Sequence, residues 1–192
     1  HSYAALARAL SELIEPLGTV DLLGHSMGGK ASMVAALNGA PIRKLIVADI
    51  APVGYSHTQM PLIDAMRALD LTSIETRAQA DAALAAVVED TTTRAFLLQS
   101  LDVRAKTWRL NLDVLADQMA DIIGFPDVTG SFDAPTLFLT GAQSDYVTRD
   151  ARPIIKPLFP KAVFAKIPEA GHWLHDEKPR EFEAAVRVFL DR

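Results

Sequence analysis

The stretch from Val20 to Lys30, which reads VDLLGHSMGGK, decides the fold of this sequence. It begins as a short apolar run typical of a buried strand and passes into a helical pattern over residues 30–37, which ends at Asn38-Gly39. Ser26 therefore lies on a strand-to-helix turn in the pattern Gly-x-Ser-x-Gly, which predicts a nucleophile elbow. The alternative is a chance match in an ordinary turn. The strand before the serine, the helix after it and a Gly-His pair far downstream favour the catalytic interpretation.

The elbow makes specific demands on its backbone. The turn is so tight that we expect a side chain at Gly24 or Gly28 to collide with its neighbours. Ser26 should adopt a strained conformation that lifts its hydroxyl clear of the main chain. The Met27 N–H lies at the start of a helix, where an unpaired donor and the helix dipole can face a developing oxyanion. The sequence thus predicts Ser26 as nucleophile and Met27 as half of an oxyanion hole.

Composition limits the classes of partner. A chain of 192 residues with 49% hydrophobic content is long enough for one domain with a substantial core. The formal net charge of -5 and the lack of a basic cluster argue against nucleic acid or an anionic membrane surface as partner. No apolar stretch approaches the length of a membrane span, so no stable membrane insertion is expected. A small neutral or apolar substrate fits better.

The sequence contains no cysteine. Disulfides, thiolate nucleophiles and zinc–thiolate sites are therefore excluded. A chain without cysteine is compatible with a reducing compartment, and we expect the protein to be cytoplasmic.

The chain opens directly with an amphipathic helical pattern over residues 1–17. In the fold that a nucleophile elbow implies, the serine strand is central and earlier strands pair beside it. We therefore expect the N-terminal part of the domain to be missing from this sequence. That part would carry the loop with the second oxyanion N–H and any targeting segment.

The rest of the chain alternates strand and helix patterns, with one long interruption. A continuous apolar run over 42–50 predicts a buried parallel strand that ends near Asp49, and helical periodicity then extends from residue 60 to about 123. So long an insertion predicts a helical lid over residues 54–123, because its few helices could hardly bury a core as a separate bundle. Residues 1–53 and 124–192 should form one α/β core. Its later elements are a strand at 134–141, a helix at 149–159, a strand at 162–167 and a closing helix that begins at Pro179.

Five histidines compete for the role of the base that a serine nucleophile needs. His172 follows the last predicted strand on a Gly-His loop, which places it at the same carboxyl edge of the sheet as Ser26. We therefore predict His172 as the base. The other candidates are His1 at the terminus, His25, interpreted as a packing residue of the elbow, His57 on the approach to the lid, and His175, interpreted as support for the loop.

A metal cluster is the alternative interpretation of this loop, because His172, His175, Asp176 and Glu177 lie close together in the sequence. No second histidine group or carboxylate helix of matching spacing accompanies them. The sequence therefore predicts no metal site.

Four segments together resemble the α/β-hydrolase superfamily, and more closely its YbfF-type bacterial esterases. They read GHSMGGK at 24–30, DIAPV at 49–53, WRLN at 108–111 and GHWLHDEKP at 171–179. The resemblance covers essentially the whole chain. It implies an α/β-hydrolase fold, with a mostly parallel sheet, helices on both faces and a helical lid insertion.

The same resemblance implies a serine hydrolase that uses no cofactor and cleaves carboxylic esters through an acyl-enzyme intermediate. Short acyl esters are the expected substrates, with acyl-CoA thioesters as a further class. Rival interpretations are a C–C hydrolase or a cofactor-free peroxidase on the same residues, and a non-catalytic protein that binds a ligand in the same fold.

Two aspartates fit the chain order Ser, acid, His that this fold requires. In the resembling esterases the aspartate of the Asp-Ile-Ala-Pro segment is the implied acid, which favours Asp49. The wider superfamily most often keeps its acid after the next strand, where Asp145 lies. We favour Asp49 and retain Asp145 as the alternative.

Overall fold

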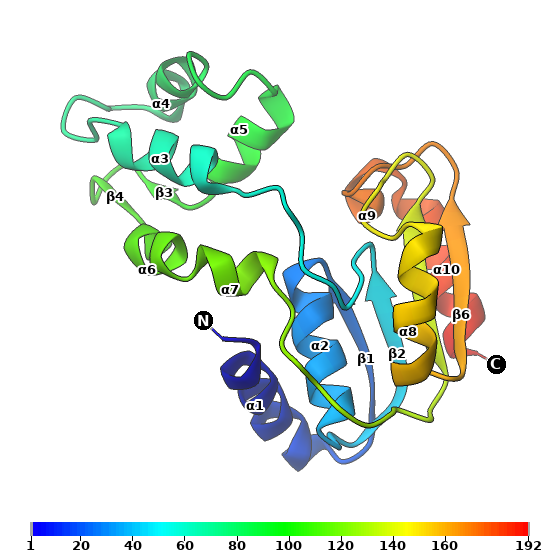
Figure 1. The fold of residues 1–192 in the computed structure, drawn as a ribbon. Coiled ribbons are helices and arrows are strands. Elements are labelled where there is room, and N and C mark those ends of the chain that lie inside the picture. Colours follow the sequence, from blue (N-terminus) through cyan, green and yellow to red (C-terminus); the bar gives the residue numbers. More distant parts are fainter. Residues whose placement is uncertain (1, 192) are drawn as a thin grey trace. The chain divides into compact units, whose positions relative to one another are not determined.

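The computed structural model describes residues 2–191, which form two compact units. The helical unit is Tyr55–Ile123, and the sheet unit combines Ser2–Gly54 with the chain from Gly124 onward. Figure 1 draws both units and labels most of their elements. Along residues 2–191, no helix combines the length and the apolar composition that a bilayer crossing requires.

Four parallel strands form the sheet, in the order β1-β2-β5-β6 (Figure 1). The register aligns the last residues of neighbouring strands, with His25 opposite Ala48 and Gly141 opposite Ile167. The carboxyl ends of all these strands therefore meet at one edge of the sheet, where parallel sheets carry their sites. The strands are β1 (Val20–His25), β2 (Ile42–Ala48), β5 (Thr136–Gly141) and β6 (Ala162–Ile167).

Helices cover both faces of this sheet. Successive side chains of a strand point to opposite faces, so apolar strands present an apolar surface on each face that a helix can bury. On one face, Val47 lies against α2 (Met27–Leu37), and Phe138 contacts Phe159 at the end of α8 (Arg152–Leu158), with ring centroids 5.8 Å apart. On the other face, a buried apolar cluster that includes Ile46, Leu137 and Leu139 packs against α10 (Pro179–Leu190). The predicted α/β fold with a parallel sheet is thus confirmed.

Further helices complete the sheet unit. The first helix, α1 (Tyr3–Ile14), packs on α2 through a small cluster that contains Tyr3, Ala7 and Val34. Ser2 caps this helix by accepting a hydrogen bond from the Ala5 N–H. The short elements are η1 (Glu15–Leu17), η2 (Arg149–Ala151) and α9 (Leu174–Glu177).

Lys30 is almost fully buried, with 1% of its surface exposed. Its ammonium donates a hydrogen bond to the Gly124 carbonyl at 2.5 Å and lies 5.6 Å from the centre of the Tyr3 ring. Burial lowers the pKa of Lys30 to about 8. Lys30 of α2 thereby anchors Gly124, the residue at which the chain returns to the sheet unit.

The helical unit has its own apolar core, which includes Met66, Leu84 and Leu101. Arg94 is buried beside it and is satisfied by the Asp81 carboxylate and two backbone carbonyls. A short antiparallel hairpin in this unit was not predicted, because strands of two residues are too short to show an alternating pattern. The elements are α3 (Met60–Ala68), α4 (Arg77–Leu84), α5 (Thr91–Leu98), β3 (Leu101–Asp102), β4 (Thr107–Trp108), α6 (Leu112–Asp117) and α7 (Met119–Ile123).

Candidate active site

Ser26 is the turn residue between β1 and α2, as the elbow pattern predicted. Its backbone has φ 53° and ψ −123°, a region that a residue with a side chain rarely adopts. Hydrogen bonds hold it there, because the Ser26 N–H donates to the Ala48 carbonyl and the Lys30 N–H donates to the Ser26 carbonyl. The serine hydroxyl is therefore fixed at the carboxyl edge of the sheet.

The glycines of the elbow differ in what they allow. A Cβ at Gly24 would overlap the Gly28 carbonyl and lie 2.5 Å from the Ser32 hydroxyl, and one at Gly29 would lie 2.6 Å from Ile50. A Cβ at Gly28 would meet nothing within 4 Å, so the predicted collision at Gly28 was wrong. The close approach of α2 to the sheet needs Gly24 and Gly29 instead.

This difference gives a stability prediction. We expect Gly24→Ala to lower the free energy of unfolding by about 1–3 kcal/mol, because the new methyl overlaps backbone that cannot move alone. Gly28→Ala, four residues away, should change it by no more than about 1 kcal/mol. Urea denaturation of both variants measures the difference, and equal destabilisation would show that the elbow packs less tightly than described.

Asp49 directly follows β2 and is fully buried. It has φ 51°, and its own N–H donates to the Leu139 carbonyl of the neighbouring strand at 2.9 Å. Its carboxylate accepts hydrogen bonds from the Gly141 N–H at 3.1 Å and from the Ser144 hydroxyl. These hydrogen bonds satisfy the carboxylate oxygens in a buried place, where an unpaired polar group would be costly.

His172 lies between the other two candidate residues. Its Nε2 is 3.0 Å from the Ser26 Oγ, and its Nδ1 is 2.8 Å from the Asp49 Oδ2. A carboxylate can only accept, so the Asp49 contact places the proton on Nδ1 and leaves Nε2 free to accept the serine proton. The structure thus brings together Ser26, His172 and Asp49, in the geometry that general-base activation of a serine requires.

Hydrogen bonds to Glu177 and stacking on Tyr146 hold the loop that carries His172. The Glu177 carboxylate accepts hydrogen bonds from the Gly171 N–H at 2.7 Å and from the Trp173 N–H at 3.1 Å. The Tyr146 ring stacks on the His172 ring, with centroids 4.0 Å apart and planes 18° apart. Burial, aided by the nearby Asp145 carboxylate, raises the pKa of Tyr146. Glu177 therefore has a structural task, and the described residues contain no group of three or more side chains able to hold a metal ion.

The two remaining predicted residues lie close to this arrangement. Asp145 is exposed on the loop after β5, whereas Ser144, the residue before it, reaches the Asp49 carboxylate. Met27 is the first residue of α2, so its N–H lies at the positive end of that helix. Its side chain is exposed.

Sequence reasoning missed Ser144 and Tyr146. Both follow β5, whose end lies at the same edge as the ends of β1 and β2. Their position just after a strand was the signal that could have pointed to them. Polar residues after strands are common, however, so this position alone does not identify the ones that reach a site.

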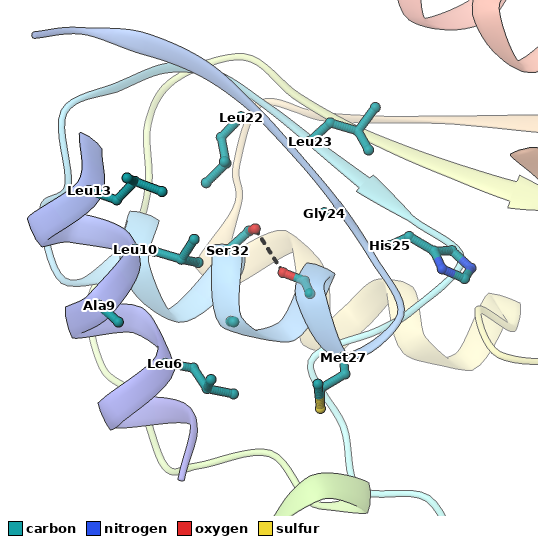
Figure 2. Close-up of a pocket in the computed structure, with 12 residues that line it drawn as sticks. Leu6, Ala9, Leu10, Leu13, Leu22, Leu23, Gly24, His25, Met27 and Ser32 are labelled. Carbon is teal, nitrogen blue, oxygen red and sulfur yellow. Dashed lines mark hydrogen bonds between the residues drawn. The ribbon is translucent and has the colours of Figure 1, made fainter. Parts of the chain in front are cut away.

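An apolar groove of about 460 Å³ runs along β1 on the side of α1. Figure 2 shows Leu6, Leu10 and Leu13 of α1 on one side of it and Leu22 of β1 on the other. Met27 also lines this groove, so apolar surface extends to the start of α2.

Comparisons with known proteins agree with this fold. Residues 1–185 match the model of the "Alpha/beta hydrolase family". The sequence is 41% identical over 201 residues to the sn-1-specific diacylglycerol lipase ABHD11 of Mus musculus, covering 98% of this chain and 65% of that protein. It is 36% identical to esterase YbfF of Escherichia coli (strain K12), covering 99% of this chain and 75% of that protein.

A solved structure of a marine microorganism esterase superposes with a TM-score of 0.92 at 34% identity, covering 98% of this chain and 77% of the other. The chain therefore belongs to the alpha/beta hydrolase family, and the predicted likeness to the YbfF-type esterases is confirmed. It spans less than two thirds of the length of the ABHD11 proteins it matches.

Proposed function

We propose that the protein hydrolyses carboxylic esters, with Ser26 as nucleophile, His172 as base and Asp49 as the acid that orients it. One observation carries this proposal: the His172 imidazole lies within hydrogen-bond distance of both the Ser26 hydroxyl and the Asp49 carboxylate. Esterase and lipase relatives at 36% and 41% identity support the same reaction.

The mechanism follows from these three groups. His172 Nε2 takes the hydroxyl proton as Ser26 Oγ attacks the acyl carbon, and the carbonyl oxygen becomes an oxyanion. Collapse of this intermediate expels the alcohol, which takes the proton from His172 and leaves an acyl-enzyme. Water then attacks the acyl carbon, with His172 again as base, and releases the acid and the free serine.

We propose the Met27 N–H as one donor to the oxyanion. Met27 is the first residue of α2, a helix of 11 residues. The first N–H groups of a helix have no partner within the helix, and the positive end of the helix dipole lies beside them. In α2 these groups lie at the elbow. A single donor of this kind contributes about 10²–10³ in turnover in enzymes of known mechanism.

A fluorophosphonate probe and a substrate panel test the proposal together. The Ser26 oxygen should displace fluoride from phosphorus, and mass spectrometry should find the adduct on Ser26 alone. Ester cleavage is then measured with p-nitrophenyl esters of increasing chain length, a diacylglycerol and an acyl-CoA. Folded protein that neither labels nor cleaves any of them would favour the non-catalytic binding protein.

Within this panel we propose short acyl esters as the preferred substrates, with acyl-CoA thioesters as a further class. The relative named as an sn-1-specific diacylglycerol lipase makes a glycerolipid ester the main competitor. Relative kcat/KM values across the panel separate the three classes.

Asp49→Asn should reduce ester turnover by about 10⁴-fold. The amide nitrogen would face His172 Nδ1 as a donor, which forces the proton onto Nε2 and leaves His172 unable to accept from Ser26. Asp145→Asn, on the exposed loop after β5, should change turnover little. A large loss only at Asp145 would overturn the assignment of the acid.

The helical unit should govern chain-length preference if it acts as the predicted lid. Three large apolar side chains in it are exposed by 45% or more, namely Val87, Phe96 and Leu110. We expect Phe96→Ala to shift preference toward longer acyl chains, because loss of a large ring from a lid would leave more room for the acyl chain. The measurement is kcat/KM across the ester series, with Val87→Ala and Leu110→Ala alongside. An unchanged profile in all three variants would count against a lid.

A further inference from the structure

His25 connects the elbow to the loop that carries the candidate base. It is the last residue of β1, so its backbone leads directly into Ser26. Its side chain reaches a residue 147 positions away, where Nε2 lies 2.8 Å from the His172 carbonyl oxygen. A carbonyl oxygen only accepts, so His25 must donate through an Nε2–H.

The His25 ring also packs among the side chains of that loop. Its centroid lies 4.8 Å from the His172 ring, 4.6 Å from the His175 ring and 5.8 Å from the Trp173 ring. The titratable groups that act on it are His172, His175 and Asp49. Burial, together with the two other histidines, lowers the pKa of His25 to about 4, so the ring is neutral near pH 7.

A neutral ring at this position suits the chemistry. During the reaction His172 becomes an imidazolium, and a second positive charge less than 5 Å away would oppose that step. The neutral His25 can keep its hydrogen bond to the His172 carbonyl throughout, because that bond uses the backbone of His172 and does not compete with the contacts of its ring nitrogens to Ser26 and Asp49.

We propose that His25 is a positioning residue, which fixes the backbone of His172 so that the imidazole stays in register with Ser26. This inference rests on the proposed serine mechanism. The backbone of His25 places the nucleophile and its side chain places the base, so one residue sets the distance between them. Displacement of a reacting group by about 1 Å can cost about 10²-fold in turnover.

The sequence interpretation of His25 as a packing residue gives a different expectation. Packing requires only an apolar ring of similar size, whereas positioning requires an N–H that reaches the His172 carbonyl. His25→Phe keeps the ring without the donor. His25→Gln keeps an N–H at similar reach without the ring, and His25→Asn carries the same amide one methylene shorter.

Steady-state kinetics of the three variants test the proposal. We expect His25→Phe and His25→Asn to lower kcat by about 10- to 100-fold with little change in KM, since only the alignment of the base is lost. His25→Gln should recover most of the turnover. A kcat of His25→Phe equal to that of the parent would overturn the proposal. So would a kcat of His25→Gln no higher than that of His25→Asn when the two variants have the same melting temperature. If the Phe variant fails to fold, the Gln and Asn pair still decides.

A second measurement does not depend on turnover. The His172 Nδ1–H, hydrogen-bonded to Asp49, should give a downfield proton signal in NMR of the folded protein. That signal should persist in His25→Gln and broaden or disappear in His25→Asn. If the parent neither cleaves esters nor labels with fluorophosphonate, the proposed function fails, while this signal still reports whether His25 positions His172. An unchanged signal in the Asn variant would contradict the inference.

Discussion

Ser26→Ala is expected to reduce ester hydrolysis by about 10⁴- to 10⁶-fold, because it removes the oxygen that forms the acyl-enzyme in the proposed mechanism. The fold should survive, since the substitution deletes one hydroxyl and keeps the Cβ that the backbone at φ 53° already accommodates. Turnover of a short p-nitrophenyl ester and a thermal melt by circular dichroism measure the two effects separately.

Ser32→Ala is the matched control for this prediction. Ser32 lies on α2, the helix that follows Ser26, and its hydroxyl donates to the Gly28 carbonyl at 2.7 Å. Its loss should lower stability by about 1 kcal/mol and leave turnover near that of the parent. Hydrolysis by Ser26→Ala within about tenfold of the parent would rule out the serine mechanism, because loss of a true nucleophile has a far larger effect.

The elbow was predictable because its signals are local. Gly24, Ser26 and the apolar run before them lie within one short stretch, and tight strand-to-helix turns accept few residues. The parallel sheet was predictable for a related reason, since apolar runs over 42–50 and 162–167 read as buried strands without any knowledge of their partners. The structure adds their order and register.

The choice of acid could not be derived from local patterns. Asp49 and Asp145 follow adjacent strands, β2 and β5, so both lie at the carboxyl edge of the sheet. What separates them is the direction of a side chain, which depends on φ 51° at Asp49 and on the hydrogen bonds from Gly141 and Ser144. Those contacts join residues more than 90 positions apart, and no sequence period encodes them.

The roles of the glycines were only partly predictable for the same reason. The motif correctly predicts that a side chain at Gly24 would collide with its neighbours, and it wrongly predicts the same at Gly28. Which glycine makes room depends on the rotation of α2, and this turns Gly29 toward Ile50 while leaving open space at Gly28. A pattern of residue types contains no information on that rotation.

His172→Ala should be about as damaging as loss of the serine, with a reduction of about 10⁴- to 10⁶-fold in ester turnover. In the proposed mechanism the two side chains act as one unit, because His172 Nε2 lies 3.0 Å from Ser26 Oγ. Without the base, the serine keeps its proton and cannot attack. The double variant Ser26→Ala, His172→Ala should therefore be little worse than either single variant, because effects within such a unit do not add.

His175→Ala is the control that locates the base, because His175 is a second histidine on the same loop, three positions further on. It is exposed, and its ring lies 4.6 Å from the His25 ring, 6.0 Å from the Phe182 ring and 6.1 Å from the Trp173 ring. Removing it deletes a packing contact beside the loop and leaves the His172 hydrogen bonds to Ser26 and Asp49 in place. We expect turnover within about tenfold of the parent, since the reacting groups are untouched. A loss equal to that of His172→Ala would mean that the base is misassigned, and kcat/KM measured side by side on one ester decides between the two histidines.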